Sequence, residues 1–97
     1  MFARVSTIQV TPQRVGEAIK MFQEKAIPGV KAMKGFKAAN FLVDRKTGNS
    51  KAIFFFDTEE NLKASSEPAS QLRTQITQAL GAKVLSVEEY ELAAQSW

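Results

Sequence analysis

The sequence predicts an α+β fold in which strands and helices follow one another in the order β-α-β-β-α-β over a single domain of residues 1–97. Three observations support this prediction. Two strand segments rich in apolar residues are joined by a short turn in the middle of the chain, helical patterns flank them on both sides, and a further strand segment stands near each end. This order is that of the ferredoxin-like fold, whose antiparallel sheet carries both helices on one face.

The first strand is expected over residues 2–10, where Val, Ile and Thr are frequent. Thr11 and Pro12 then suit the N-cap and the first position of a helix. The apolar residues of this helix recur at spacings of three and four and form one stripe: Val15, Ala18, Ile19, Phe22 and Ala26. The pair Pro28 and Gly29 is expected to break or kink the helix.

The middle of the chain is predicted to form an antiparallel hairpin of residues 36–43 and 51–56. Asp44 opens the turn, and Gly48 closes it because glycine readily takes the positive φ that a short loop requires. Neither strand alternates apolar with polar residues, as a strand with one wet face would. Both faces of the hairpin therefore need cover, and a chain of this length supplies a helical layer for only one. We expect a second copy of the chain to cover the other, giving a homodimer through the open sheet face.

The second helix is predicted in two pieces. Asp57 and Glu60 resemble a capping box that starts the first piece, which extends to about Ser65. A fresh cap and a proline then restart the helix, and Gly81 is placed to end it in a left-handed conformation. The longer piece is expected to bury four apolar residues: Leu72, Ile76, Ala79 and Leu80. Residues 83–92 are expected to form the last strand.

Several classes of site are excluded by composition, because the chain contains neither cysteine nor histidine. Disulfides, zinc sites built on these ligands, thiol nucleophiles, a Ser-His-Asp arrangement and a proximal-histidine haem site are all ruled out. The acidic residues do not follow a calcium-loop spacing, and Glu88, Glu89 and Glu91 are expected on a solvated strand edge. We therefore expect no metal and no cofactor. No apolar run approaches the ~20 residues of a membrane span and no signal peptide is recognisable, so a cytoplasmic protein without a membrane partner is predicted.

Nearly the whole chain also carries sequence features of a known group. They are E-A-I-K-M-F-Q-E in the first helix, then P-G, the run G-F-K-A-A-N-F-L-V-D-R-K-T-G, and D-T-E-E-N-L-K-A-S after the aromatic strand. With these features the chain resembles the dimeric α/β-barrel superfamily, the small proteins similar to antibiotic biosynthesis monooxygenases. The resemblance implies two ferredoxin-like subunits whose sheets pack face to face, with a cleft between each sheet and its own helices.

The resemblance also implies a range of activities. Some members of the group oxidise phenolic or quinol-type aromatics with dioxygen and without metal or flavin, others degrade haem, and many have no known activity. In this chain Phe56 stands where the group often has a tryptophan at the strand end, and no residue matches the histidine of the haem-degrading branch. Haem degradation is therefore not expected.

Five residues are candidates for a site in that cleft. Asn40, the one polar residue amid an apolar strand stretch, is expected to hold a forming oxyanion, and its alternative is an amide satisfied by a backbone group. Tyr90 is expected to position or relay a proton, and its alternative is packing with the hydroxyl at a rim. Phe22, Phe54 and Phe56 are expected to contact a ligand, while the alternative for the aromatic residues is the core and the dimer interface.

The function that these features favour is binding of a small apolar or aromatic molecule in the sheet–helix cleft of a homodimeric barrel. Two alternatives stay open, a cofactor-free monooxygenase acting on a phenol or quinol, and an RNA-binding module. The RNA-recognition motif shares the element order, and residues 34–36 and Phe41 match parts of its RNP1 signature. Residues 37–39 do not match, and RNP1 belongs on the third strand, so no nucleic-acid partner is expected. The basic residues between 25 and 51 of this chain of net charge +3 are assigned to a solvated surface.

Overall fold

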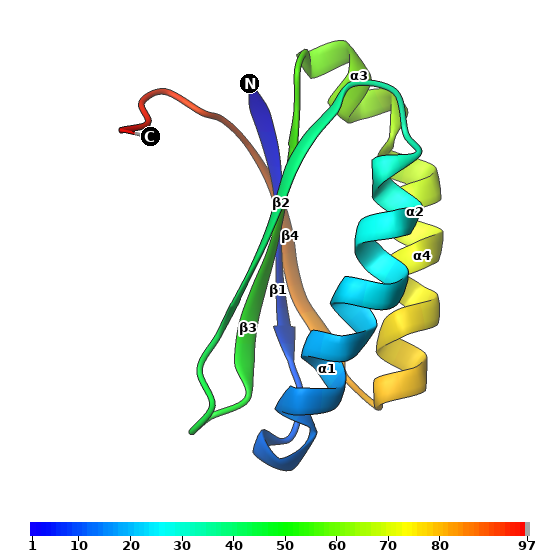
Figure 1. Cartoon of the computed structure of the whole chain (residues 1–97), viewed down its shortest axis with the longest axis vertical. Helices are drawn as coiled ribbons and strands as arrows, with labels where there is room; N and C mark the ends of the chain where they lie inside the picture. Colours follow the sequence, from blue (N-terminus) through cyan, green and yellow to red (C-terminus); the bar gives the residue numbers. More distant parts are fainter. Residues whose placement is uncertain (97) are drawn as a thin grey trace.

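Four antiparallel strands form one sheet in the order β2-β3-β1-β4 in the computed structural model, which describes residues 1–96. The strands are β1 (Phe2–Gln9), β2 (Phe36–Val43), β3 (Asn49–Phe56) and β4 (Lys83–Glu91). The helices all lie on one face of this sheet (Figure 1). This arrangement confirms the predicted ferredoxin-like fold.

The first helical segment changes its hydrogen-bond pattern along its length. It consists of η1 (Pro12–Arg14), α1 (Val15–Met21), the π-helical η2 (Phe22–Ala26) and α2 (Ile27–Lys31). The apolar stripe along it packs on the sheet as predicted.

The helix does not break at Pro28, because it continues through Pro28 to Lys31, and the alternative of a kink there stays a prediction. Proline has no N–H and cannot donate an α-helical hydrogen bond. The wider π-helical turn η2, just before Pro28, has already shifted the α-helical hydrogen-bond pattern, so the helix tolerates the proline there. Gly29 has a different role: a Cβ atom there would lie 2.6 Å from Leu72 Cδ2, so the glycine lets α2 approach the last helix closely. Thr11 precedes the segment in an extended conformation, but its side chain makes no capping hydrogen bond.

The second helical segment is divided as predicted into α3 (Glu59–Ala64) and α4 (Ser66–Leu80). Its first cap is one residue later than expected: Thr58 is the N-cap and its hydroxyl accepts from the Asn61 amide at 3.1 Å. Asp57 instead accepts from the Asn61 side chain at 2.8 Å. Gly81 ends α4 with φ +63°, as predicted. Ala79 faces solvent, which corrects its assignment to the core.

The central hairpin forms where the sequence placed it, with β3 beginning two residues early. Asp44 Oδ1 accepts from the Lys46 amide at 2.9 Å, and Gly48 has φ +78°. A bulge between Phe36 and Ala38 changes the expected alternation of β2, so that Phe36 contacts the same core as the helices. Beyond the bulge, alternate residues of β2 face the helices.

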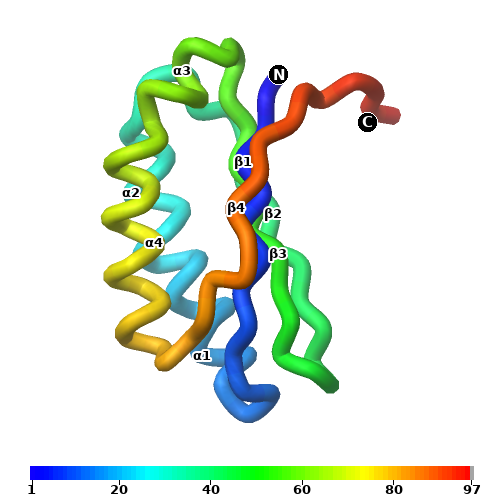
Figure 2. Tube along the Cα trace, turned by 180° about the vertical axis from the view of Figure 1, so that it is seen from behind, coloured from blue at the N-terminus to red at the C-terminus, as the bar shows by residue number. Residues whose placement is uncertain are grey.

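The face of the sheet opposite the helices, called the open face here, has no cover from the described residues of this chain (Figures 1 and 2). Strand register places seven apolar or aromatic side chains on it: Ala3, Val5, Ala38, Leu42, Ile53, Phe55 and Tyr90. Leu42 is 55% exposed and Tyr90 is 54% exposed. Residues 92–96 lead away from the sheet on this side (Figure 2).

No helix of residues 1–96 has the length and the apolar character needed to cross a membrane.

Candidate functional site

A cavity of about 60 Å³ lies between the sheet and the helices. One wall of it is aromatic: the ring of Phe22 on η2 stacks on Phe41 of β2, with 4.7 Å between centroids, and on Phe54 of β3, with 5.4 Å. Most of the remaining lining is aliphatic and comes from both layers: Ile8, Ala18, Ala26, Ala52, Leu72 and Ile76. Mostly apolar walls with a few polar groups are typical of small-molecule sites.

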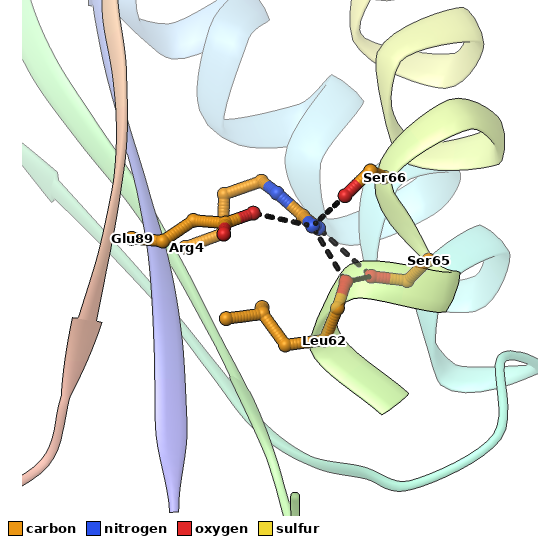
Figure 3. Close-up of polar contacts among 5 residues, drawn as sticks. All are labelled: Arg4, Leu62, Ser65, Ser66 and Glu89. Carbon is orange, nitrogen blue, oxygen red and sulfur yellow. Dashed lines mark hydrogen bonds and ion pairs between the residues drawn. The ribbon is translucent and has the colours of Figure 1, made fainter. Parts of the chain in front are cut away.

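Arg4 is part of this lining, and its guanidinium joins β1 to the junction of α3 and α4 (Figure 3). Arg4 is 3% exposed; its Nη1 donates to Ser65 Oγ at 2.9 Å and its Nη2 to the Leu62 carbonyl at 2.8 Å. Nη2 also lies 3.0 Å from Ser66 Oγ and 3.1 Å from the Glu89 carboxylate of β4. A buried charge needs such pairing and hydrogen bonding to be tolerated.

Two further polar side chains reach the cavity without a partner. Ser6 follows Arg4 on the same face of β1 and is 2% exposed, yet its hydroxyl makes no hydrogen bond within residues 1–96. Arg73 of α4 is half-buried, and its guanidinium forms no hydrogen bond or ion pair with any other described residue. Burial lowers the pKa of Arg73, and the charge of Arg4 lowers it further. The other hydroxyls of the lining are satisfied, since Ser50 and Thr77 each donate to a backbone carbonyl at 2.9 Å.

Of the three aromatic residues predicted to contact a ligand, Phe22 and Phe54 line the cavity. Phe56 does not. Its ring is fully buried in a separate part of the core with Val30 and Leu62. The core alternative therefore holds for Phe56, because its position as the last residue of β3 places it under α3 and α2 rather than beside Phe22.

Asn40 and Tyr90 lie outside the cavity. Asn40 stands between Ala39 and Phe41, which pack toward the helices, so its exposed side chain faces the other way. It borders a second, more open hollow of about 290 Å³ between β2 and the first helical segment, which contributes Ile19, Gln23 and Ile27. Tyr90 donates to Glu88 Oε2 at 2.9 Å, and this hydrogen bond raises the pKa of Tyr90. Neither residue lines the cavity beside Phe22 and Phe54, and their predicted role in a site stays a prediction.

Arg4, Ser6 and Arg73 were not predicted from the sequence. A signal was present for each. Arg4 and Ser6 alternate with apolar residues along β1, on the side that register gives to the helices, and Arg73 lies four residues from Ala69 and from Thr77 on the buried stripe of α4. Glu89 lies on the edge strand β4 and is partly exposed, as expected, and its carboxylate is also the ion-pair partner of Arg4. Charged residues are almost never fully buried unless paired, so a charged residue within a buried stripe is an informative signal.

The aromatic positions of the RNA-binding alternative are turned inward. Phe36 packs edge-on against Phe56, with centroids 6.3 Å apart, and Phe41 stacks on Phe22. Neither ring lies on the open face, where an RNA-recognition motif stacks bases. The absence of a nucleic-acid partner stays a prediction.

Within residues 1–96, no group of three or more acidic side chains gathers in a way that would hold a metal ion. Among the polar residues around the cavity are two arginines, two serines and a threonine. Arginine is a donor only, so this set suits an anion or a hydrogen-bond acceptor rather than a cation.

No family model matches the chain. Its sequence is similar to two uncharacterized proteins of Mycobacterium tuberculosis H37Rv. Rv2558 is 29% identical over 93% of this chain and 39% of its own length, and Rv2557 is 30% identical over 97% of this chain and 42% of its own length. The chain thus spans about two fifths of the length of the curated relatives that it matches.

The fold is that of the antibiotic biosynthesis monooxygenase-like proteins, as the sequence resemblance predicted. A Deinococcus radiodurans structure described as a candidate antibiotic biosynthesis monooxygenase superposes with a TM-score of 0.74 at 11% identity, over 99% of this chain and 96% of the other. HapK from Hahella chejuensis gives a TM-score of 0.76 at 10% identity, over 100% of this chain and 97% of the other. The haem-degrader MhuD of Mycobacterium tuberculosis, solved with two haems in its active site, gives 0.76 at 18% identity over the full length of both chains. At these identities the likeness shows the fold alone.

Haem does not fit the cavity of this chain. The lining contains no histidine, cysteine, tyrosine or methionine that would serve as an axial ligand. A volume of about 60 Å³ is also well below the roughly 300–1,000 Å³ of pockets that hold drug-sized ligands.

Proposed function

We propose that this chain is a ligand-binding protein that holds a small apolar or aromatic molecule in the cavity between its sheet and its helices. The observation that carries this proposal is the stacked wall of Phe22, Phe41 and Phe54 facing aliphatic side chains of the opposite layer. Such a wall offers a flat molecule both apolar area and ring faces.

The proposal includes a homodimer formed through the open face. Leu42, Ile53 and Phe55 would leave an apolar patch in water if the chain stayed alone, and patches beyond a few hundred Å² are uncommon on monomers. In Rv2558 and Rv2557 the part outside the match is longer than the matched part, which leaves room for a second unit of this size in one chain. In this chain, a second copy would cover the open face in the way that such a second unit could.

Light scattering at micromolar concentration tests the dimer. Leu42→Lys places a charge on the exposed apolar part of the open face and is expected to shift the protein toward monomer, whereas Ala79→Lys, on the solvent side of α4, leaves the mass unchanged. A folded wild-type protein that scatters as a monomer contradicts the dimer without touching the cavity.

The binding proposal is tested by titrating isobutanol, phenol and toluene, neutral molecules of increasing apolar size, into ¹⁵N-labelled protein and following amide shifts. We expect the shifts to cluster around the cavity, on β1, β3 and α4. Ala69→Leu fills part of the cavity from α4, where Ala69 is 8% exposed, and should abolish the shifts. Ala79→Leu is the matched control on the exposed side of the same helix. Binding that survives Ala69→Leu in a folded protein, or no binding of any compound, refutes the proposal.

A cofactor-free monooxygenase remains the alternative, with the fold likeness as its support. We keep Asn40 and Tyr90 as its proposed catalytic residues, on the open face rather than in the cavity. A cytoplasmic location and a single domain over residues 1–97 complete the proposal.

A further inference from the structure

The charges around the cavity do not balance. Arg4 and Arg73 bring two positive charges to the lining, and Glu89, at 3.1 Å from Arg4, brings one negative charge. No other ion pair within residues 1–96 involves these side chains, because the second one joins Arg14 to Glu17 at the start of α1. One positive charge of the site is therefore left over, and it belongs to Arg73.

Ser6 is the second unused group. Its hydroxyl has no hydrogen-bond partner, yet no side-chain nitrogen or oxygen of the described residues is both unpaired and fully inaccessible. The Ser6 oxygen must therefore border open volume, and the volume beside it is the cavity. Buried hydroxyls are normally hydrogen-bonded, so the Ser6 hydroxyl, which is 2% exposed and borders the cavity, can donate a hydrogen bond to an acceptor bound there.

The hydrogen bonds of Arg4 separate its role from that of Arg73. The four contacts of the Arg4 guanidinium, one through Nη1 and three through Nη2, go to the α3–α4 junction and to Glu89, so Arg4 is held in place by this chain and its charge is paired. By contrast, none of the N–H groups of the Arg73 guanidinium donates a hydrogen bond to another described residue. A planar guanidinium matches the two oxygens of a carboxylate, which it binds through two parallel hydrogen bonds.

We propose that the cavity binds a small monocarboxylate, whose carboxylate accepts from Arg73 and Ser6 and whose apolar body lies against Phe22 and Phe54. This inference rests on the proposed function and adds to it the class of ligand. One leftover positive charge calls for one negative charge, which favours a monoanion over a phosphate ester carrying nearly two.

The volume limits the size of the body. A cavity of about 150 Å³ accepts a benzene ring. At about 60 Å³ the present cavity admits a short branched aliphatic body, and an aromatic ring enters only when lining side chains such as Leu72 turn aside. Isobutyrate is therefore the first probe and benzoate the second.

The experiment compares each acid with its neutral amide: isobutyrate with isobutyramide, and benzoate with benzamide. The full chain, in its native assembly, is titrated in a low-chloride buffer at pH 7 by ¹⁵N NMR and calorimetry. We expect each carboxylate to bind at least tenfold more tightly than its amide. Arg73→Gln is expected to remove that preference, and Ser6→Ala to reduce it.

Arg45→Gln is the matched control, since it removes the same charge from the exposed hairpin turn and should leave the preference intact. Equal binding of acid and amide by the wild-type protein overturns the carboxylate inference but leaves the proposed function standing. Absence of binding by acids, amides and neutral apolar molecules alike overturns both, and leaves ordered water as the occupant. Inorganic phosphate that competes as well as isobutyrate also overturns the inference, because the apolar body would then contribute nothing. If Arg73→Gln fails to fold, Ser6→Ala and the wild-type comparison still decide.

Discussion

The hydrogen bonds of Arg4 predict a large loss of stability when its guanidinium is removed. Arg4→Met keeps an unbranched apolar stem in β1 but deletes the bonds to Ser65 and to the Leu62 carbonyl, both in the buried interior. A hydrogen bond to a charged group contributes about 1.5–3 kcal/mol to stability. The variant offsets part of this loss, because the folded protein no longer has to bury a charge. Ser66 and Glu89 are more exposed, so water replaces their bonds at small cost.

The net expected cost of Arg4→Met is about 2–3 kcal/mol, or a fall of roughly 10–20 °C in Tm for a domain of this size. Glu89→Gln removes only the ion pair, whose carboxylate side chain is 35% exposed, and should cost about 1 kcal/mol or less. Urea denaturation followed by circular dichroism measures both, at several protein concentrations because dimerisation would add to the apparent stability. Arg45→Met, at the exposed turn, serves as the control. The reasoning is refuted if Arg4→Met is as stable as wild type, or if Glu89→Gln costs more than Arg4→Met.

Three further predictions concern individual groups. The hydrogen bond to Glu88 raises the pKa of Tyr90, so this bond stabilises the fold below the ordinary tyrosine pKa, and the stabilisation is lost as pH rises through the pKa of the folded state. Glu88→Gln should lower the pKa of Tyr90 in an ultraviolet titration, which reports on Tyr90 because the chain has one tyrosine. The bond from Asn61 lowers the pKa of Asp57, so Asn61→Ala should raise it by NMR, and the stability difference from wild type should be present above pH about 4 and shrink as pH falls through the folded pKa. Asn40→Ala and Tyr90→Phe should leave the protein folded but reduce oxygen uptake on any hydroquinone or naphthol that the wild type oxidises by roughly 10²–10³-fold; uptake unaffected by both changes removes them as catalytic residues.

The parts of the fold that sequence predicts well are those fixed by local chemistry. Asp44 and Gly48 set the hairpin because an aspartate side chain and a positive φ act within a few residues. The helix end at Gly81 is predictable for the same reason. The cap of α3 was misplaced by one residue because Asp57 and Thr58 are both good capping residues, and only the extended backbone at position 58 decides between them.

The parts that sequence could not predict depend on contacts between distant residues. Pro28 is a helix breaker in isolation, but the packing of Gly29 against Leu72 holds α2 against α4. The burial of Arg4 depends on the α3–α4 junction, whose residues lie 58 to 62 positions further along the chain. The sequence around β1 therefore gives no indication of these partners. The bulge after Phe36 likewise decides which residues of β2 face the helices, and with them the side on which Asn40 lies.

The positions of Asn40 and Tyr90 restrict where any activity that uses both can take place. β2 and β4 are the two edges of the sheet, with β3 and β1 between them, so three strand spacings, roughly 14 Å, separate their strands across the open face, and the register offsets the two residues by two further positions along the strands. That distance is too great for both to contact one small reacting group within a single chain. If both act on one substrate, the second residue must come from the partner subunit, and the reaction must lie between the two sheets. Mixed dimers that carry Asn40→Ala in one subunit and Tyr90→Phe in the other would then retain one intact site of two, whereas a site built within each chain would lose both. Oxygen uptake by such mixed dimers distinguishes an interface reaction from one confined to a single subunit.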